Sequence, residues 1–131
     1  MNRPILYYRT LLWPVVSLLV TGVVHFTMEA IWPELHAVFV PSVLAPALLA
    51  YGAWIGYRMV GAGGAYLDAL VAGVIVGVLP IILEVVGFGI VLGRGAQPGL
   101  LAGLFGFTMI VFGAVLGGGF VLSRSAHAPG R

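Results

Sequence analysis

The chain has 131 residues, of which 61% are hydrophobic and only 8% are charged, and its formal net charge is +2. A soluble domain of this length cannot bury so much apolar surface, so the composition predicts a protein covered by lipid. The arginines are scattered, which argues against a nucleic-acid partner. Cysteine is absent, which excludes disulfides, thiolate metal sites and covalently attached haem.

Apolar runs of membrane-spanning length follow one another along the chain. We predict helices at about residues 11–32, 36–60, 65–93 and 98–123, followed by a short polar tail at 124–131. These runs lack the alternation of polar and apolar residues that is typical of membrane β-strands. The predicted fold is an all-α integral membrane protein, a single domain formed by a bundle of four transmembrane helices.

The placement of arginine predicts the orientation of this bundle. Five arginines fall on the side that carries both termini, whereas Arg94 falls on the other side. Because cytoplasmic segments of membrane proteins carry the excess of positive charge, we expect both termini in the cytoplasm. We expect a multi-pass protein of the bacterial inner membrane, with the lipid bilayer and either further copies or other membrane subunits as partners. The five arginines are Arg3, Arg9, Arg58, Arg124 and Arg131.

Glycines recur on one face of each of the last two predicted helices. Helices in lipid associate by close packing, which small residues permit. We therefore expect the third and fourth helices to pack against each other along these faces. The glycines concerned are Gly73, Gly77 and Gly87 on the third helix, and Gly103, Gly106, Gly113 and Gly117 on the fourth.

A polar group on each helix falls in the outer half of the bilayer. At 1.5 Å per residue, Glu84 lies about 13 Å and His25 about 10 Å below the outer surface. Ser42 and Thr108 lie at about 9 and 15 Å by the same count, and Glu29 is one helical turn from His25. Because an acidic side chain near the bilayer centre costs about 2.5 to 3.5 kcal/mol, such groups find partners inside the bundle. We predict that these residues form a buried polar layer.

This layer has two main interpretations. In the first, His25 and Glu84 form a buried hydrogen-bonded pair that fixes the arrangement of the helices, and Ser42 and Thr108 bond to backbone carbonyls. In the second, Glu84 relays protons or holds a cationic substrate, with His25 as its relay partner. The two interpretations differ in the effect that a Glu84→Gln substitution has on function.

A metal site is a third interpretation, because His25 and Glu29 are one turn apart and Glu34 and His36 lie on the adjoining loop. These side chains are ligand types for zinc or manganese. Their spacing matches no metal motif, so the sequence predicts neither a metal nor another cofactor. A b-type haem needs two axial ligands, and His25 is the only histidine placed clearly within the hydrocarbon region.

Motifs for catalysis are missing from the sequence. It contains no phosphate-binding loop, no Gly-x-Ser-x-Gly and no His-Glu-x-x-His,. We therefore expect a small polytopic membrane protein that is not an enzyme, either a self-contained bundle or an accessory or assembly subunit of a membrane complex. The alternative function is a small proton-linked transporter or channel that uses Glu84 with His25.

Overall fold

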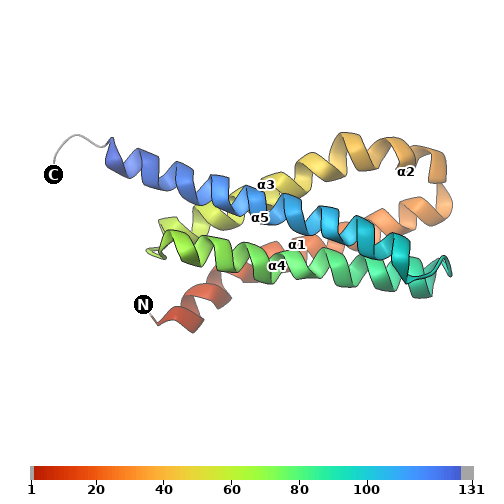
Figure 1. The fold of residues 1–131 in the computed structure, drawn as a ribbon, viewed down its shortest axis with the longest axis horizontal. Helices are drawn as coiled ribbons and strands as arrows, with labels where there is room; N and C mark the ends of the chain where they lie inside the picture. The colour runs from red at the N-terminus through yellow and green to blue at the C-terminus, as the bar shows by residue number, and fades with distance from the viewer. Residues whose placement is uncertain (1, 128–131) are drawn as a thin grey trace.

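The computed structural model describes residues 2–127, and every regular element within that range is helical. In chain order these are α1 (Arg3–Ile31), α2 (Pro33–Phe39), η1 (Val40–Leu44), α3 (Ala45–Gly61), α4 (Tyr66–Val86), η2 (Gly87–Val91) and α5 (Ala96–Ala126). The helices form a bundle in which the chain reverses direction from one span to the next. The start of α1 lies at the same end of the bundle as the end of α5 (Figure 1).

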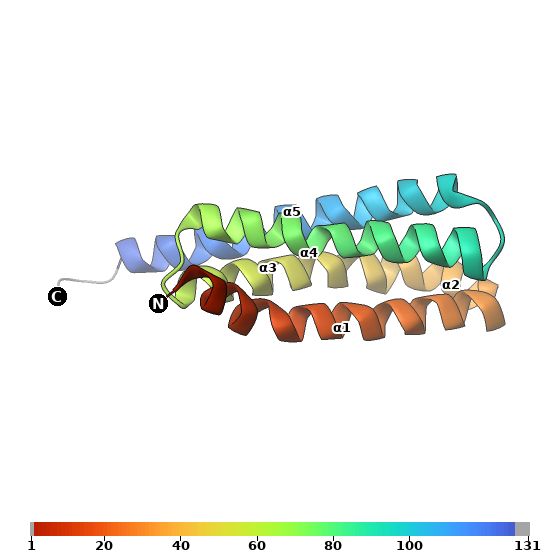
Figure 2. The same cartoon turned by 90° about the horizontal axis from the view of Figure 1, so that it is seen from below.

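Four helical spans among the described residues are long and apolar enough to cross a membrane. They are Arg3–Ile31, Pro33–Gly61, Tyr66–Val91 and Ala96–Ala126, and they lie roughly parallel or antiparallel to one another (Figure 2). The prediction of an all-helical chain with four spans of membrane-crossing length is confirmed.

The ends of the helices differ from the predicted ends. α1 begins at Arg3 rather than near residue 11, and α5 continues to Ala126 into the predicted polar tail. The reason is that hydropathy marks the apolar part of a helix, whereas a helix ends where its backbone hydrogen bonds end. The remainder of the predicted tail, residues 128–131, lies outside the described residues.

A tight turn at Trp32 joins α1 to α2. Pro33 occupies the first turn of α2, where its missing N–H costs no helical hydrogen bond,. The chain therefore reverses directly, and α2 starts beside the end of α1. Pro41 then lies in η1, a π-helical segment in which the Ala45 N–H donates to the Val40 carbonyl five residues earlier,.

The first half of α5 packs against α4 at glycines. A Cβ on Gly103 would stand 2.5 Å from the Ile81 Cα, and one on Gly106 would stand 2.9 Å from the Pro80 Cβ. From the other side, a Cβ on Gly73 would stand 2.7 Å from the Cβ of Ala114. A Cβ on Gly77 would likewise meet the Phe107 ring. These glycines allow the two helices to approach closely.

Two glycines in the second half of α5, Gly113 and Gly117, face a different neighbour. A Cβ on Gly113 would stand 2.8 Å from the Ala53 backbone nitrogen, and one on Gly117 would meet the backbone of the same residue. Both positions therefore face α3 and not α4, which corrects the expectation of a single α4–α5 face. Gly87, expected on that face, instead lies against the Phe26 ring of α1. The glycines of α5 contact both α3 and α4 because α5 lies in the groove between these two helices,.

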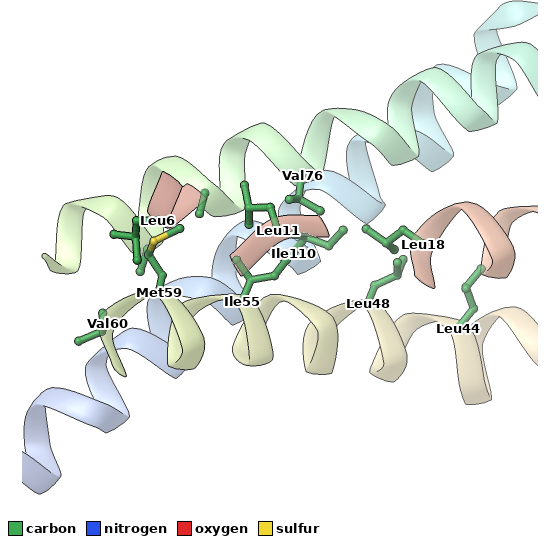
Figure 3. Packing of buried hydrophobic residues seen from close by; sticks show 12 residues of the cluster. Leu6, Leu11, Leu18, Leu44, Leu48, Ile55, Met59, Val60, Val76 and Ile110 are labelled. Atoms are coloured by element: carbon green, nitrogen blue, oxygen red, sulfur yellow. The ribbon is translucent and has the colours of Figure 1, made fainter. Parts of the chain in front are cut away.

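Helix α1 makes a different kind of contact with the bundle. Its leucine side chains point into the space between α3 and α4, where they meet Ile55, Val76 and Ile110 (Figure 3). Those three residues are fully buried. Because leucines rather than glycines separate α1 from the other helices, this side of the bundle has room for a cavity. The leucines of α1 are Leu6, Leu11 and Leu18.

We predict that Gly113→Ala destabilises the protein and that Gly119→Ala on the same helix does not. The added methyl group at Gly113 meets the backbone of α3, whereas at Gly119 the nearest atom, the Tyr66 Cε2, is 4.0 Å away. Overpacking of this kind costs about 1 to 3 kcal/mol. Thermal unfolding in a mild detergent, followed by circular dichroism, measures the difference. Equal unfolding midpoints for the two variants would contradict the close α3–α5 packing.

Candidate functional site

The α1–α2 turn and the α4–α5 connection lie at the same end of the bundle (Figure 1). Ionisable side chains from four parts of the chain meet there. We call this group the polar cluster. Its charged and polar contacts link α1 to α2, to α4 and to the connection before α5. The members are His25, Glu29, His36, Glu84 and Arg94.

His25 and Glu84 meet between α1 and α4. The His25 Nε2 lies 3.2 Å from the Glu84 Oε1, and both side chains are largely buried, with 5% and 13% of their surface exposed. The depth count along the two helices placed these residues at a similar level, and the structure brings them into contact. Phe26, which follows His25 on α1, packs edge-on against its ring.

The other ring nitrogen of His25 faces α2. The His36 Nε2 lies 3.0 Å from the His25 Nδ1, and it is also 3.8 Å from the Glu29 Oε2. In a direct hydrogen bond between two imidazole nitrogens, one donates and the other accepts. Both nitrogens of His25 therefore have a polar neighbour, His36 on one side and Glu84 on the other.

Glu29 forms an ion pair with a residue of the α4–α5 connection. The Arg94 guanidinium donates to the Glu29 Oε1 in an ion pair, and the glutamate is only 5% exposed, whereas the arginine is about half exposed. The connection is shaped by Gly93 and Gly95, which adopt φ values of +61° and +84° that favour glycine,. The Arg94 N–H also donates to the Phe88 carbonyl, which fixes the start of this loop.

The local sequence explains how each helix places its side chain in the polar cluster. His25 and Glu29 are four residues apart and so share one face of α1. The direct turn into α2 brings His36 back beside them. A π-helical segment begins soon after each of His36 and Glu84, at η1 and η2 respectively, and such segments are frequent at functional sites.

A cavity of about 240 Å³ lies beside the polar cluster, between α1, α3, α4 and α5. Its walls are mainly apolar, and the cluster contributes His25, His36 and Glu84. Thr21, one turn from His25, also lines the cavity, and its hydroxyl lies 3.2 Å from the Tyr51 hydroxyl. An apolar cavity with a few converging polar groups is the usual form of a small-ligand site.

The cluster also contains buried atoms that lack a hydrogen-bond partner. Among the described residues these atoms are the His25 Nε2, the Glu29 Oε2 and the Glu84 Oε2. His25 and Glu84 are close, but their contact does not have the geometry of a hydrogen bond. Each buried group left without a partner costs about 1 to 3 kcal/mol. Their concentration at one place makes the cluster the candidate site of the described chain, where a water molecule or an ion would supply the missing partners.

Ser42 and Thr108 do not join the polar cluster. Both are exposed on the surface of the bundle, and the Thr108 hydroxyl donates to the Leu104 carbonyl within its own helix. Glu34, grouped with the possible metal ligands on the sequence, is exposed as well. A count of residues from a helix end gives the depth of a side chain but not the direction in which it points.

His36 and Arg94 are the members of the cluster that the depth count missed. His36, expected at the start of the second helix and grouped there with His25 and Glu29 as a possible metal ligand, lies in α2 beside both of them. Signals for both were present in the sequence. The Trp32-Pro33 turn is too short to carry His36 far from α1, and Arg94 is the single arginine on the side where the first and third helices carry glutamates.

No protein-family model matches the chain, and comparisons with curated proteins and with solved structures give no match.

Proposed function

We propose that the protein is a non-catalytic, multi-pass protein of the bacterial inner membrane that binds a small cation at the polar cluster. Membrane insertion is supported by the four apolar spans of the described chain and by large apolar side chains on their outer surfaces. Ile90, Val23 and Leu101, for example, are 76%, 68% and 65% exposed. Lipid is the environment that covers such a surface favourably.

The observation that carries the proposal is the acidic excess of a buried cluster beside a cavity. Glu29 and Glu84 bring two carboxylates, and Arg94 brings one guanidinium, which pairs with Glu29. Counted with ionised carboxylates and neutral histidines, the cluster has a formal charge of one negative unit. An uncompensated charge in an apolar interior is costly, so the site favours a positively charged ligand.

The cluster suits a protein that acts as a self-contained binding bundle or as an accessory subunit of a membrane complex. The alternative is a small proton-linked transporter or channel. One observation favours it, namely that His25 and Glu84 both line the cavity and so stand beside a space that a translocated ion can enter. In that case we expect a homo-oligomer, because four helices seldom enclose a pathway by themselves.

The arginine distribution supports an orientation with both ends of the described chain in the cytoplasm. We predict that green fluorescent protein fused after Arg131 fluoresces in bacterial cells, because it folds on the cytoplasmic side. Alkaline phosphatase inserted after Gly95, beside the lone Arg94, is predicted to be active outside the membrane. The opposite pair of results would reverse the orientation.

We predict that a cation raises the thermal unfolding midpoint of the purified protein and that Glu84→Gln reduces this rise. A ligand at 100 times its Kd stabilises the folded state by about 2.7 kcal/mol. The cations to compare are potassium, manganese, zinc and tetraethylammonium, and Glu34→Gln is the matched control because that glutamate is exposed.

Two results would contradict the proposed function. One is that no cation of any class changes the midpoint of the wild-type protein, and the other is that Glu84→Gln responds as the wild type does. Uptake of the stabilising cation by proteoliposomes, lost in Glu84→Gln, would favour the transporter over the binding subunit.

A further inference from the structure

We infer that the polar cluster binds a divalent transition-metal ion of the zinc and manganese class, with the His25 Nδ1, the His36 Nε2 and one Glu29 carboxylate oxygen as ligands. This inference rests on the proposed function and names the chemical class of its cation. Potential ligand atoms of these three residues lie within 4.8 Å of one another. Two imidazoles and a carboxylate are a common ligand set for such ions.

The distances between the ligand atoms fit one ion. Bonds of 2.0 to 2.1 Å to a tetrahedral zinc place neighbouring ligand atoms about 3.3 to 3.4 Å apart. The distance from the His25 Nδ1 to the His36 Nε2 is 3.0 Å, and that from the His36 Nε2 to the Glu29 Oε2 is 3.8 Å. These two values lie on either side of the required spacing, and the whole set of three ligand atoms lies within 4.8 Å.

The neighbours of the ligands have the arrangement expected around a metal site. A histidine that binds a metal through one nitrogen usually has a carboxylate or carbonyl at the other. Here the Glu84 carboxylate lies 3.2 Å from the His25 Nε2, and its negative charge favours a proton on that nitrogen, which leaves Nδ1 free to bind an ion. In the same way, Arg94 holds the Glu29 Oε1 and leaves Oε2 free.

The buried Glu29 Oε2 is an independent observation that points to a ligand. This oxygen has no hydrogen-bond partner, and only 5% of its residue is exposed. A direct hydrogen bond between the two histidines, without a metal, leaves this oxygen unsatisfied. A cation between the three side chains replaces that hydrogen bond and gives the carboxylate oxygen its missing partner.

Three protein ligands leave a fourth position in a tetrahedral site. In proteins, closed sites with four side-chain ligands are structural, whereas sites with three keep a position for water or an exchangeable group. Because His25 and His36 also line the cavity, the bound ion lies next to a space that water can enter. The site therefore suits an ion that exchanges, rather than one that is permanently enclosed.

The inference is tested by metal titration of the full chain, purified in mild detergent and stripped with a chelator. We expect one Zn²⁺ per chain by calorimetry, and a Co²⁺ complex with the visible absorption of a tetrahedral site. In a histidine-selective ¹⁵N NMR spectrum, zinc should shift the ring signals of His25 and His36. His127, which is exposed at the end of α5, is the internal control and should not shift.

Variants separate the ligands from their neighbours. His36→Gln removes a ligand from a largely buried position and should weaken zinc binding by at least about 100-fold. Glu84→Gln removes only the partner of a ligand and should weaken it by about 10 to 100-fold. Glu34→Gln and His127→Gln alter exposed side chains and should bind zinc as the wild type does.

The inference is overturned if zinc fails to bind in a one-to-one ratio, if His36→Gln binds as tightly as the wild type, or if the His127 signal is the one that shifts. The wild-type NMR result decides the matter even where a variant fails to fold. If zinc, manganese and cobalt all fail while another cation stabilises the protein, the metal site is refuted and the proposed function stands. If no cation acts, both fail.

Discussion

A carboxylate placed among apolar side chains must find a partner, and this electrostatic requirement accounts for the arrangement at one end of the bundle. Glu29 and Glu84 come from different helices, and each is met by a group from another part of the chain. Arg94, from the α4–α5 connection, pairs with Glu29, and His25 of α1 contacts Glu84. His36 of α2 contacts the other side of the His25 ring. The same contacts hold the α1–α2 turn beside the α4–α5 connection, so the position of α1 and the composition of the cluster depend on each other.

The packing of the helices explains why this cluster lies beside a cavity. α5 approaches α3 and α4 at glycines, which brings their backbones close together,. α1 is separated from them by leucine side chains and is tied at its end by polar contacts. The bundle thus combines three tightly packed spans with a fourth that leaves space, and the polar groups lie at that less tightly packed side. Such a division is compatible with the proposed binding of a cation, because the tightly packed spans hold the polar groups in place beside the cavity,.

Sequence reasoning predicted the parts of this structure that depend on composition and on distance along a helix. Hydropathy gave the four spans, and the depth count brought His25 and Glu84 together because both lie on regular helices. It failed for Ser42 and Thr108, since depth does not specify the rotation of a helix. It missed His36 because the path of a turn depends on backbone geometry. Gly113 faces α3 rather than α4 because a glycine stripe does not identify the neighbour that it contacts.

The contact between the two imidazoles of the cluster tests this account most directly. In metal-free protein labelled with ¹⁵N at histidine and reconstituted in lipid bilayers, a solid-state ¹⁵N–¹⁵N correlation spectrum should contain a cross-peak between the rings of His25 and His36, whose nearest nitrogens are 3.0 Å apart. The cross-peak should disappear in His36→Gln. A wild-type spectrum in which no cross-peak joins the two rings would contradict the convergence of α1 and α2 on one polar cluster.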